Sequence, residues 1–337
     1  MTGSSSPANA AERDLVPAPP QEWLAEDWHF RVSVPRACTM VPGSTNPPAL
    51  DELRLLARFE RRKPSAEIAV LGALLDREVD ALDWLEQSSA LKCKQIVAVA
   101  EVARQGAQAD VEVTWKNGKG DHAGRYYATK AGPRLFVLAC SGAPDDQAQL
   151  ADDFAAVIDT FEPCLEPTAR YSEPMRRHGG ETPIPWQLTL PVSWILEIGS
   201  SSEEADSFQA ENLRRTSGGS AEMVGKLAFA VLARSAGETP REVATLYLDA
   251  VKDHGLTMGP ETVNAEPAAE PFSQSWCLVA PVLRDDLPGE LRCRVLCHPR
   301  VWVLAGVLGL TREDDVDAWM QNKRVLDLMM STLRLKP

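Results

Sequence analysis

Histidine, cysteine and glycine residues stand at four places where their types and spacing could do chemistry. The first is "GKGDHAG", whose Gly118, Gly120 and Ala123 approach the pattern of a dinucleotide-binding loop. Such a loop leads from a strand into a helix whose N-terminus holds the pyrophosphate. Here the strand-like segment "RYYATK" follows instead. We therefore interpret the glycines as the tip of a hairpin and predict no nucleotide cofactor.

The second place is "CRVLCH", where Cys293, Cys297 and His298 could hold a metal ion. On a strand the two cysteines face the same side about 13 Å apart, and the histidine points to the opposite face. That separation is too large for a disulfide or for two ligands of one zinc ion. We therefore expect both cysteines to be buried apolar residues.

The third and fourth places concern acyl transfer. "RRHGG" is similar to an esterase oxyanion loop, and His122 beside Asp121 could activate a nucleophile. The chain contains no G-x-S-x-G nucleophile elbow. "RRHGG" is then a basic linker turn or, alternatively, a small anion-contact site at Arg176, Arg177 and His178. Because the five histidines are scattered without metal-ligand spacing, we predict no catalytic residue, no metal and no cofactor.

Two segments of nearly the same sequence indicate where the elements lie. "GPRLFVLACSG" (132–142) and "HPRVWVLAGVL" (298–308) both contain Pro-Arg, an aliphatic residue, an aromatic residue and Val-Leu-Ala. A helical pattern follows each segment, and strand, helix and strand patterns precede it in the same order. The sequence therefore predicts the order strands–helix–strands–helix twice, with Phe136 and Trp302 at equivalent positions.

The middle helix of each half carries a start signal. Thr239 and Glu242 form a capping box around Pro240 at the first helical position, and Asp80 caps a weaker pattern. We expect an α+β fold of two tandem domains, each with an antiparallel sheet and helices on one face. The expected segments are a disordered tail at 1–21, a first domain at 22–166, a linker at 167–182 and a second domain at 183–337.

Charge and composition restrict the partners. The formal net charge of −13 disfavours nucleic acid and anionic membranes, which attract basic surfaces. The N-terminus has no secretory pattern, and no run of apolar residues is long enough to insert stably in a membrane. Seven scattered cysteines are typical of reduced thiols. We expect a cytoplasmic protein, and the sequence leaves its oligomeric state open.

The element order resembles a known superfamily. An opening strand ending in proline, a middle helix, a meander, an aromatic-containing last strand and a closing helix before "IDTFEP" or "MSTLRLKP" are similar to PsbP-like and DcrB-like domains. The resemblance covers nearly the whole chain, twice, and its members are generally binding proteins. In character the chain is most similar to Eag-type chaperones of type VI secretion, which are acidic and cytoplasmic. The resemblance implies that sheet faces hold hydrophobic helices of effectors.

Several predicted strands are apolar on both faces, which an antiparallel sheet covered on one side does not need. The last strand of each half is the clearest case. One explanation is packing between domains or in a dimer; the other is a surface that binds an apolar helix or segment of a protein partner. The binding residues predicted from the second explanation are Phe136, Leu138, Trp302, Leu304 and Leu308.

Three functional hypotheses follow from the sequence. The first is a non-catalytic protein-binding adaptor or chaperone, with hydrophobic segments of secreted effectors as one class of partner. The second is a structural component of a secretion or injection assembly. The third is an enzyme with its site in an interdomain groove. An enzyme needs convergent titratable groups and a chaperone needs apolar surface, so the polarity of a groove separates them.

Overall fold

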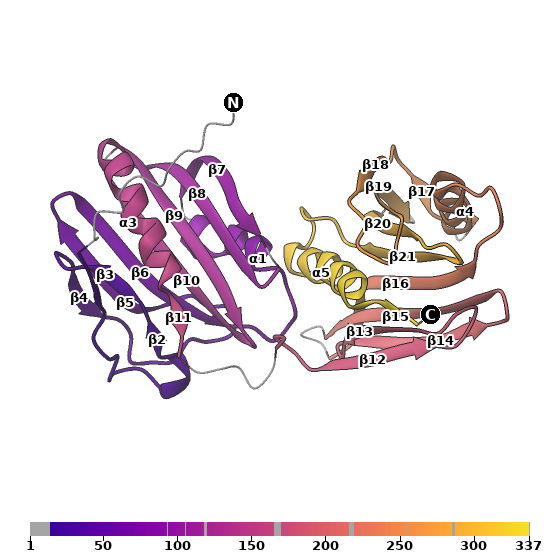
Figure 1. Ribbon diagram of the computed structural model, residues 1–337, viewed down its shortest axis with the longest axis horizontal. Helices are drawn as coiled ribbons and strands as arrows, with labels where there is room; N and C mark the ends of the chain where they lie inside the picture. Colours follow the sequence, from indigo (N-terminus) through magenta and orange to yellow (C-terminus); the bar gives the residue numbers. More distant parts are fainter. Residues whose placement is uncertain are drawn as a thin grey trace, which may run out of the picture. The chain divides into compact units, whose positions relative to one another are not determined.

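The computed structural model describes residues 14–92, 94–104, 106–117, 120–164, 170–215, 219–253, 255–284 and 287–336. The chain divides into two compact units, Met1–Ser172 (unit 1) and Glu173–Pro337 (unit 2), drawn in Figure 1. The division falls inside the predicted linker 167–182.

Within the described residues, unit 1 is built on a seven-stranded antiparallel sheet in the order β4-β5-β6-β10-β9-β8-β7. The strands of this sheet are β4 (Thr39–Pro42), β5 (Arg54–Arg62), β6 (Ser65–Leu74), β7 (Gln95–Arg104), β8 (Gln108–Asn117), β9 (Gly120–Ala131) and β10 (Arg134–Gly142). Two small sheets pair β1 (Leu15–Pro17) with β3 (Ser33–Pro35) and β2 (Phe30–Arg31) with β11 (Glu162–Pro163). The helices are η1 (Glu26–Trp28), α1 (Ala81–Gln87), α2 (Ser89–Lys92), η2 (Pro144–Asp146) and α3 (Gln147–Asp159).

Unit 2 repeats this plan. Its described strands form an eight-stranded sheet in the order β14-β15-β16-β21-β20-β19-β17, with β18 also paired to β19 (Figure 1). The bounds are β14 (Trp194–Ser201), β15 (Ala205–Arg215), β16 (Ala221–Ala233), β17 (Thr257–Met258), β18 (Thr262–Glu266), β19 (Gln274–Arg284), β20 (Leu287–Cys297) and β21 (Val301–Gly309). A second sheet holds β12 (Met175–Gly180), β13 (Trp186–Pro191) and β22 (Arg334–Leu335), and the helices are α4 (Pro240–Asp253) and α5 (Val316–Thr332).

The predicted α+β class with antiparallel sheets is confirmed, and the strand order of the main sheet is the same in both units. Four long strands, β7 to β10, follow the first helical segment in unit 1, and three, β19 to β21, follow it in unit 2 after the short strands β17 and β18. In each unit the last of these strands pairs back onto the strand that precedes the helical segment. In unit 2 this last strand is β21, between β16 and β20. The two nearly identical sequence segments are therefore the central strands, β10 and β21.

The closing helix packs on one face of each main sheet. In unit 2, Val325 and Met329 of α5 join Val303 and Val307 of β21 in one buried cluster. The Asp315 side chain caps α5 by accepting a hydrogen bond from the Ala318 amide at 3.0 Å. Apolar residues at helical spacing thus cover the odd-numbered side chains of β21.

The middle helix of unit 2 covers the other face. Val243 and Leu248 of α4 are buried with Trp302 and Leu304 of β21, in a cluster separate from that of α5. The predicted capping box is present: the Thr239 hydroxyl accepts from the Glu242 amide at 3.3 Å, and the Glu242 carboxylate accepts from the Thr239 amide at 2.8 Å. Helices therefore cover both faces of this sheet, whereas the sequence led us to expect them on one face.

The turn before the last strand is shifted by one residue between the units. In unit 1 the turn is Gly132-Pro133, and β10 begins at Arg134. In unit 2 the turn is Pro299-Arg300, and β21 begins at Val301. The Pro-Arg pair that made the two segments look alike therefore occupies different positions in the two hairpins.

A shift of one residue turns every side chain to the opposite face of a sheet. Phe136 packs with Phe161, at 5.9 Å between ring centroids, in the cluster that includes the closing helix α3. Trp302 packs under the middle helix α4. The predicted equivalence of Phe136 and Trp302 is therefore wrong, although the strands that carry them occupy the same place in the sheet order.

Two predicted irregular segments contain ordered strands. β1 lies inside the expected tail 1–21 and pairs Val16 with Val34 of β3, and Gln21 is buried. β12 lies inside the expected linker and pairs along its whole length with β13.

At the end of unit 1, the Ser172 amide donates to Glu78, which also forms a buried ion pair with Lys130 at 2.8 Å.

Candidate functional site

The structure places four of the five predicted binding residues in the core. Phe136 and Leu138 are buried in the cluster that includes α3, and Trp302 and Leu304 are only 1% and 5% exposed beneath α4. In β21 the apolar character of both strand faces is accounted for by α5 on one side and α4 on the other, which neither sequence explanation included. The fifth residue, Leu308, is half-buried and opens onto a groove.

This groove runs beside α4 and has a volume of about 300 Å³. We call it the α4 groove, and its described lining residues are Gln209, Lys226, Ala228, Tyr247, Val251, Leu256 and Leu308. Strands β15, β16 and β21 supply the sheet side, and α4 and the turn after it supply the other side. The groove exists because α4 packs on β20 and β21 and leaves the neighbouring β16 with a small residue, Ala228, on the same face.

Tyr247 closes the inner end of the α4 groove against a glycine. A Cβ atom at Gly306 of β21 would lie 1.9 Å from the Tyr247 hydroxyl oxygen, so only glycine admits the ring. Burial raises the pKa of Tyr247, which keeps the hydroxyl protonated as a hydrogen-bond donor. Among the residues that the structure describes, none accepts a hydrogen bond from it.

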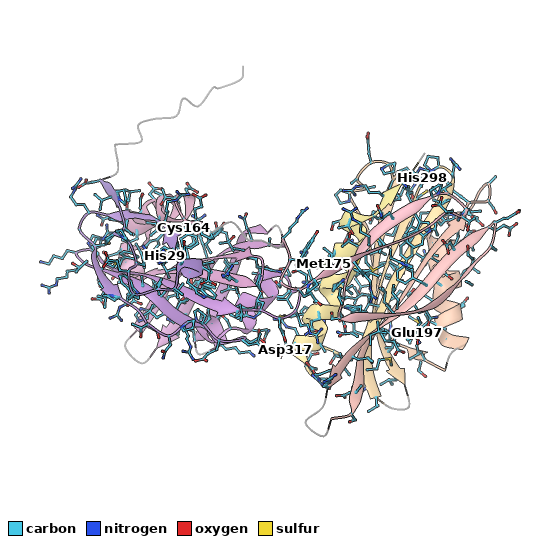
Figure 2. All side chains as sticks on the ribbon, turned by 90° about the horizontal axis from the view of Figure 1, so that it is seen from below. His29, Cys164, Met175, Glu197, His298 and Asp317 are labelled. Atoms are coloured by element: carbon cyan, nitrogen blue, oxygen red, sulfur yellow. The ribbon has the colours of Figure 1, made fainter. Side chains whose placement is uncertain are left out.

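Two carboxylates lie next to Lys226, on the strand side of the α4 groove and outside its described lining. Glu211 pairs with Lys226 across β15 and β16, and Glu197 of β14 pairs with Gln209. The Lys226 ammonium lies 3.4 Å from a Glu197 carboxylate oxygen and 3.6 Å from one of Glu211. Figure 2 labels Glu197 on unit 2. One ammonium thus faces two carboxylates.

A second depression of about 330 Å³ shares Lys226 and Leu308 with the α4 groove. We call it the strand-end patch, because the ends of β16, β19, β20 and β21 form it. Its described lining residues are Met223, Val224, Gly225, Lys226, Val282, Leu287, Pro288, Gly289, Leu308, Gly309 and Leu310. Leu287 is 69% exposed and Met223 is also exposed. Apolar surface therefore continues from beneath α4 to the end of the sheet.

The other chemical candidates do not form a site in the described residues. Cys293 and Cys297 are buried, as predicted, and burial raises the pKa of the Cys293 thiol. His122 stacks on Trp115, at 5.6 Å between ring centroids. In the part of the chain that the structure describes, no group of three or more histidine, cysteine, aspartate or glutamate residues could hold a metal ion.

Two further segments singled out in the sequence, "GKGDHAG" and "RRHGG", lie on strands where the structure describes them. β9 begins inside the glycine segment and pairs Gly120 with Asn117, which confirms the hairpin; residues 118–119 lie outside the described residues. "RRHGG" is not a turn but part of strand β12, where Arg176 donates to the Trp194 carbonyl. Burial lowers the pKa of His178. The anion-contact alternative stays a prediction.

Cys164, an exposed cysteine of unit 1, lies beside the backbone of His29. The Cys164 amide donates to the His29 carbonyl at 2.9 Å, and both residues, labelled in Figure 2, line a depression of about 520 Å³. The Nε2 atom of His29 lies 3.2 Å from the Leu24 carbonyl oxygen, a contact that holds the ring there. This depression therefore offers one thiol and no paired base that the structure describes.

The sequence predicts Leu308 as a binding residue but does not indicate the other residues of the α4 groove. Tyr247 follows Leu246 in the apolar pattern of the middle helix, yet Leu246 is 69% exposed. The signal that could have found the groove is Gly306, an isolated glycine within an apolar strand, which often marks a close approach. Its contact with Tyr247 depends on the tertiary structure.

No protein-family model matches the chain, and no curated protein is similar to it in sequence. Among solved structures, the chain is similar to the cyanobacterial PsbP of Synechocystis sp. PCC 6803 at 13% identity and a TM-score of 0.32, covering 48% of this chain and 98% of that one. It is also similar to LpqN of Mycobacterium tuberculosis, at 11% identity and a TM-score of 0.27, covering 48% and 92%.

A third similar structure is the type VI secretion immunity protein TplEi of Pseudomonas aeruginosa in complex with a peptide. Its identity to this chain is 10% and its TM-score 0.23, and the match covers 96% of this chain and 99% of that one. Among the described helices, none combines the length and the apolar character needed to cross a bilayer.

Proposed function

We propose that this protein is a non-catalytic adaptor or chaperone that binds an apolar segment of a partner protein in the α4 groove and the strand-end patch. The observation that carries the proposal is the continuity of the two: they share Lys226 and Leu308, and apolar side chains line both. Concave, mostly apolar depressions are the usual form of a binding site.

The size of the two depressions suits side chains of a protein segment. Volumes of about 300 and 330 Å³ lie at the lower end of the range for ligand sites. Each large apolar side chain transferred from water into such a site contributes about 1.5–3 kcal/mol. A segment that inserts a few such side chains therefore gains enough free energy for specific, reversible binding.

The described lining supports binding better than catalysis. It offers a phenol, an amide and an ammonium that is already paired with carboxylates. A nucleophile with an adjacent base, which acyl transfer requires, is not among these groups. More specifically, we propose that the protein binds secreted effectors in the cytoplasm. The alternative is a structural role in a secretion assembly.

Two leucines provide a matched test. Leu287 in the strand-end patch and Leu246 on α4 outside both depressions are each 69% exposed. The probe is a fluorescent helical peptide of about 14 residues, or about 21 Å, with leucine on one face and glutamine on the other. We expect Leu287→Asp to weaken binding about tenfold or more, since it places a charge in apolar contact surface, and Leu246→Asp to leave it unchanged.

Fluorescence anisotropy gives the dissociation constants, and the melting temperatures of both variants show that they remain folded. Equal binding by the two variants would contradict the location of the site. Absence of binding by the unaltered protein would contradict the proposed function.

A further inference from the structure

We infer that the segment bound in the α4 groove is a basic amphipathic helix, whose apolar face enters the groove and whose cationic side chains meet Glu197 and Glu211. The inference rests on the proposed function and adds the secondary structure and the charge of the partner.

The helical form follows from the hydrogen bonding of the sheet beneath the groove. β16 is paired on one side with β15 and on the other with β21. β15 is likewise paired with β14 as well as β16. No free strand edge therefore lies along the described floor of the groove, and an extended segment would find no backbone ladder there. A helix satisfies its own backbone groups and needs none.

The apolar face of the helix is required by the α4 side of the groove. Val251 and Leu256 on the α4 side present aliphatic surface to Leu308 on the sheet side, and the small side chain of Ala228 leaves room above the sheet. Helices bind such grooves through side chains at i, i+3, i+4 and i+7. The Tyr247 hydroxyl also lines the groove and could donate a hydrogen bond to a polar side chain of the helix.

The basic face of the helix is expected because two glutamates flank Lys226, which lines the strand side of the groove. Glu197 and Glu211 share one ammonium, that of Lys226, at 3.4 and 3.6 Å. A carboxylate has about four acceptor sites, so each of these two retains capacity for further donors. Because the two glutamates leave a net charge of −1 beside an apolar wall, a lysine or arginine of the partner gains attraction there, while an acidic side chain is repelled.

The net charge of the whole chain also favours a positively charged partner. With a formal net charge of −13, the protein attracts cationic partners at long range and repels anionic lipid surfaces. A basic peptide is therefore favoured over a membrane as the occupant.

The experiment compares three helical peptides that share one leucine face and differ on the other face, which carries lysine, glutamine or glutamate. The unaltered protein should bind the lysine peptide about tenfold more tightly than the glutamine peptide, with a preference that declines as salt is added. The glutamate peptide should bind most weakly. The double variant Glu197→Gln/Glu211→Gln should lose the preference for lysine and keep its affinity for the glutamine peptide within about twofold.

The matched control is Glu203→Gln/Glu204→Gln, which removes the same charge from exposed residues between β14 and β15. It should retain the preference for the lysine peptide. If the lysine and glutamine peptides bind equally, or if both double variants lose the preference alike, the inference is overturned while binding of apolar segments stands. If none of the three peptides binds, the proposed function itself fails.

A further arm uses vesicles of phosphatidylglycerol. The protein should stay in solution with them. Sedimentation with the vesicles that is abolished by Leu287→Asp would assign the apolar surface to lipid and overturn the inference.

Discussion

At the scale of single residues, Gly306 and Tyr247 decide whether the α4 groove exists. The ring lies where a side chain at position 306 would be, so helix and strand approach closely at this point. The charge beside the groove is net negative, because Lys226 is paired with two carboxylates, those of Glu197 and Glu211. Each of these residues is ordinary in type; its role arises from the neighbour that it faces.

We expect Gly306→Ala to destabilise the protein by about 1–3 kcal/mol, because the added methyl group overlaps the Tyr247 hydroxyl and forces α4 outward. Urea denaturation followed by circular dichroism measures the loss. In a Tyr247→Leu background the same alanine should cost much less. A cost independent of residue 247 would show that the contact with Tyr247 is not its cause.

At the scale of elements, α4 is the helix that forms one side of the groove. It is fixed by its apolar residues and by the capping box at its start. The closing helix α5 has more described buried residues than α4, and a carboxylate caps its start. The groove therefore depends on the less extensively buried helix of unit 2.

Removing the N-terminal cap of α4 should destabilise this helix. We expect Thr239→Ala to lower the free energy of unfolding by about 0.5–2 kcal/mol, since the hydroxyl accepts from the Glu242 amide. Hydrogen exchange of the α4 amides should accelerate, and affinity for the leucine-faced peptides should fall. Thr245→Ala in the middle of α4, where the hydroxyl donates only to the Arg241 carbonyl, is the control. Faster exchange throughout unit 2 would contradict a local effect.

At the scale of the whole molecule, each unit has a core of its own. The boundary between Ser172 and Glu173 separates two sets of internal contacts, and each unit carries its own main sheet. The side chain of Glu78 holds the last residue of unit 1, and that of Glu173 accepts from the Ser193 amide within unit 2. All residues of the α4 groove and the strand-end patch belong to unit 2.

We therefore expect the fragment 173–337 to fold alone and to bind the lysine peptide with the affinity of the full chain. Its circular dichroism and a cooperative thermal transition test folding, and anisotropy tests binding. The fragment 1–172 is the control and should not bind. Binding by 1–172, or a folded 173–337 without affinity, would move the site out of unit 2.

The sequence by itself determined the order of the elements, the two halves, the antiparallel α+β class and the cap of α4. These features follow from local periodicity and from short-range hydrogen bonds, such as that between Thr239 and Glu242. Sequence similarity also located the central strands, β10 and β21. It could not fix their register, because the turns at Gly132-Pro133 and Pro299-Arg300 differ by one position.

Only the tertiary structure decided which apolar residues are core and which line a surface. Trp302 and Leu304 are covered because α4 packs over them, whereas Leu308, on the same strand face, lies where that cover ends. The groove itself joins residues from β15, β16, α4 and β21, which are far apart in sequence. Side-chain periodicity specifies a face of one element, but whether another element covers that face depends on how distant segments pack.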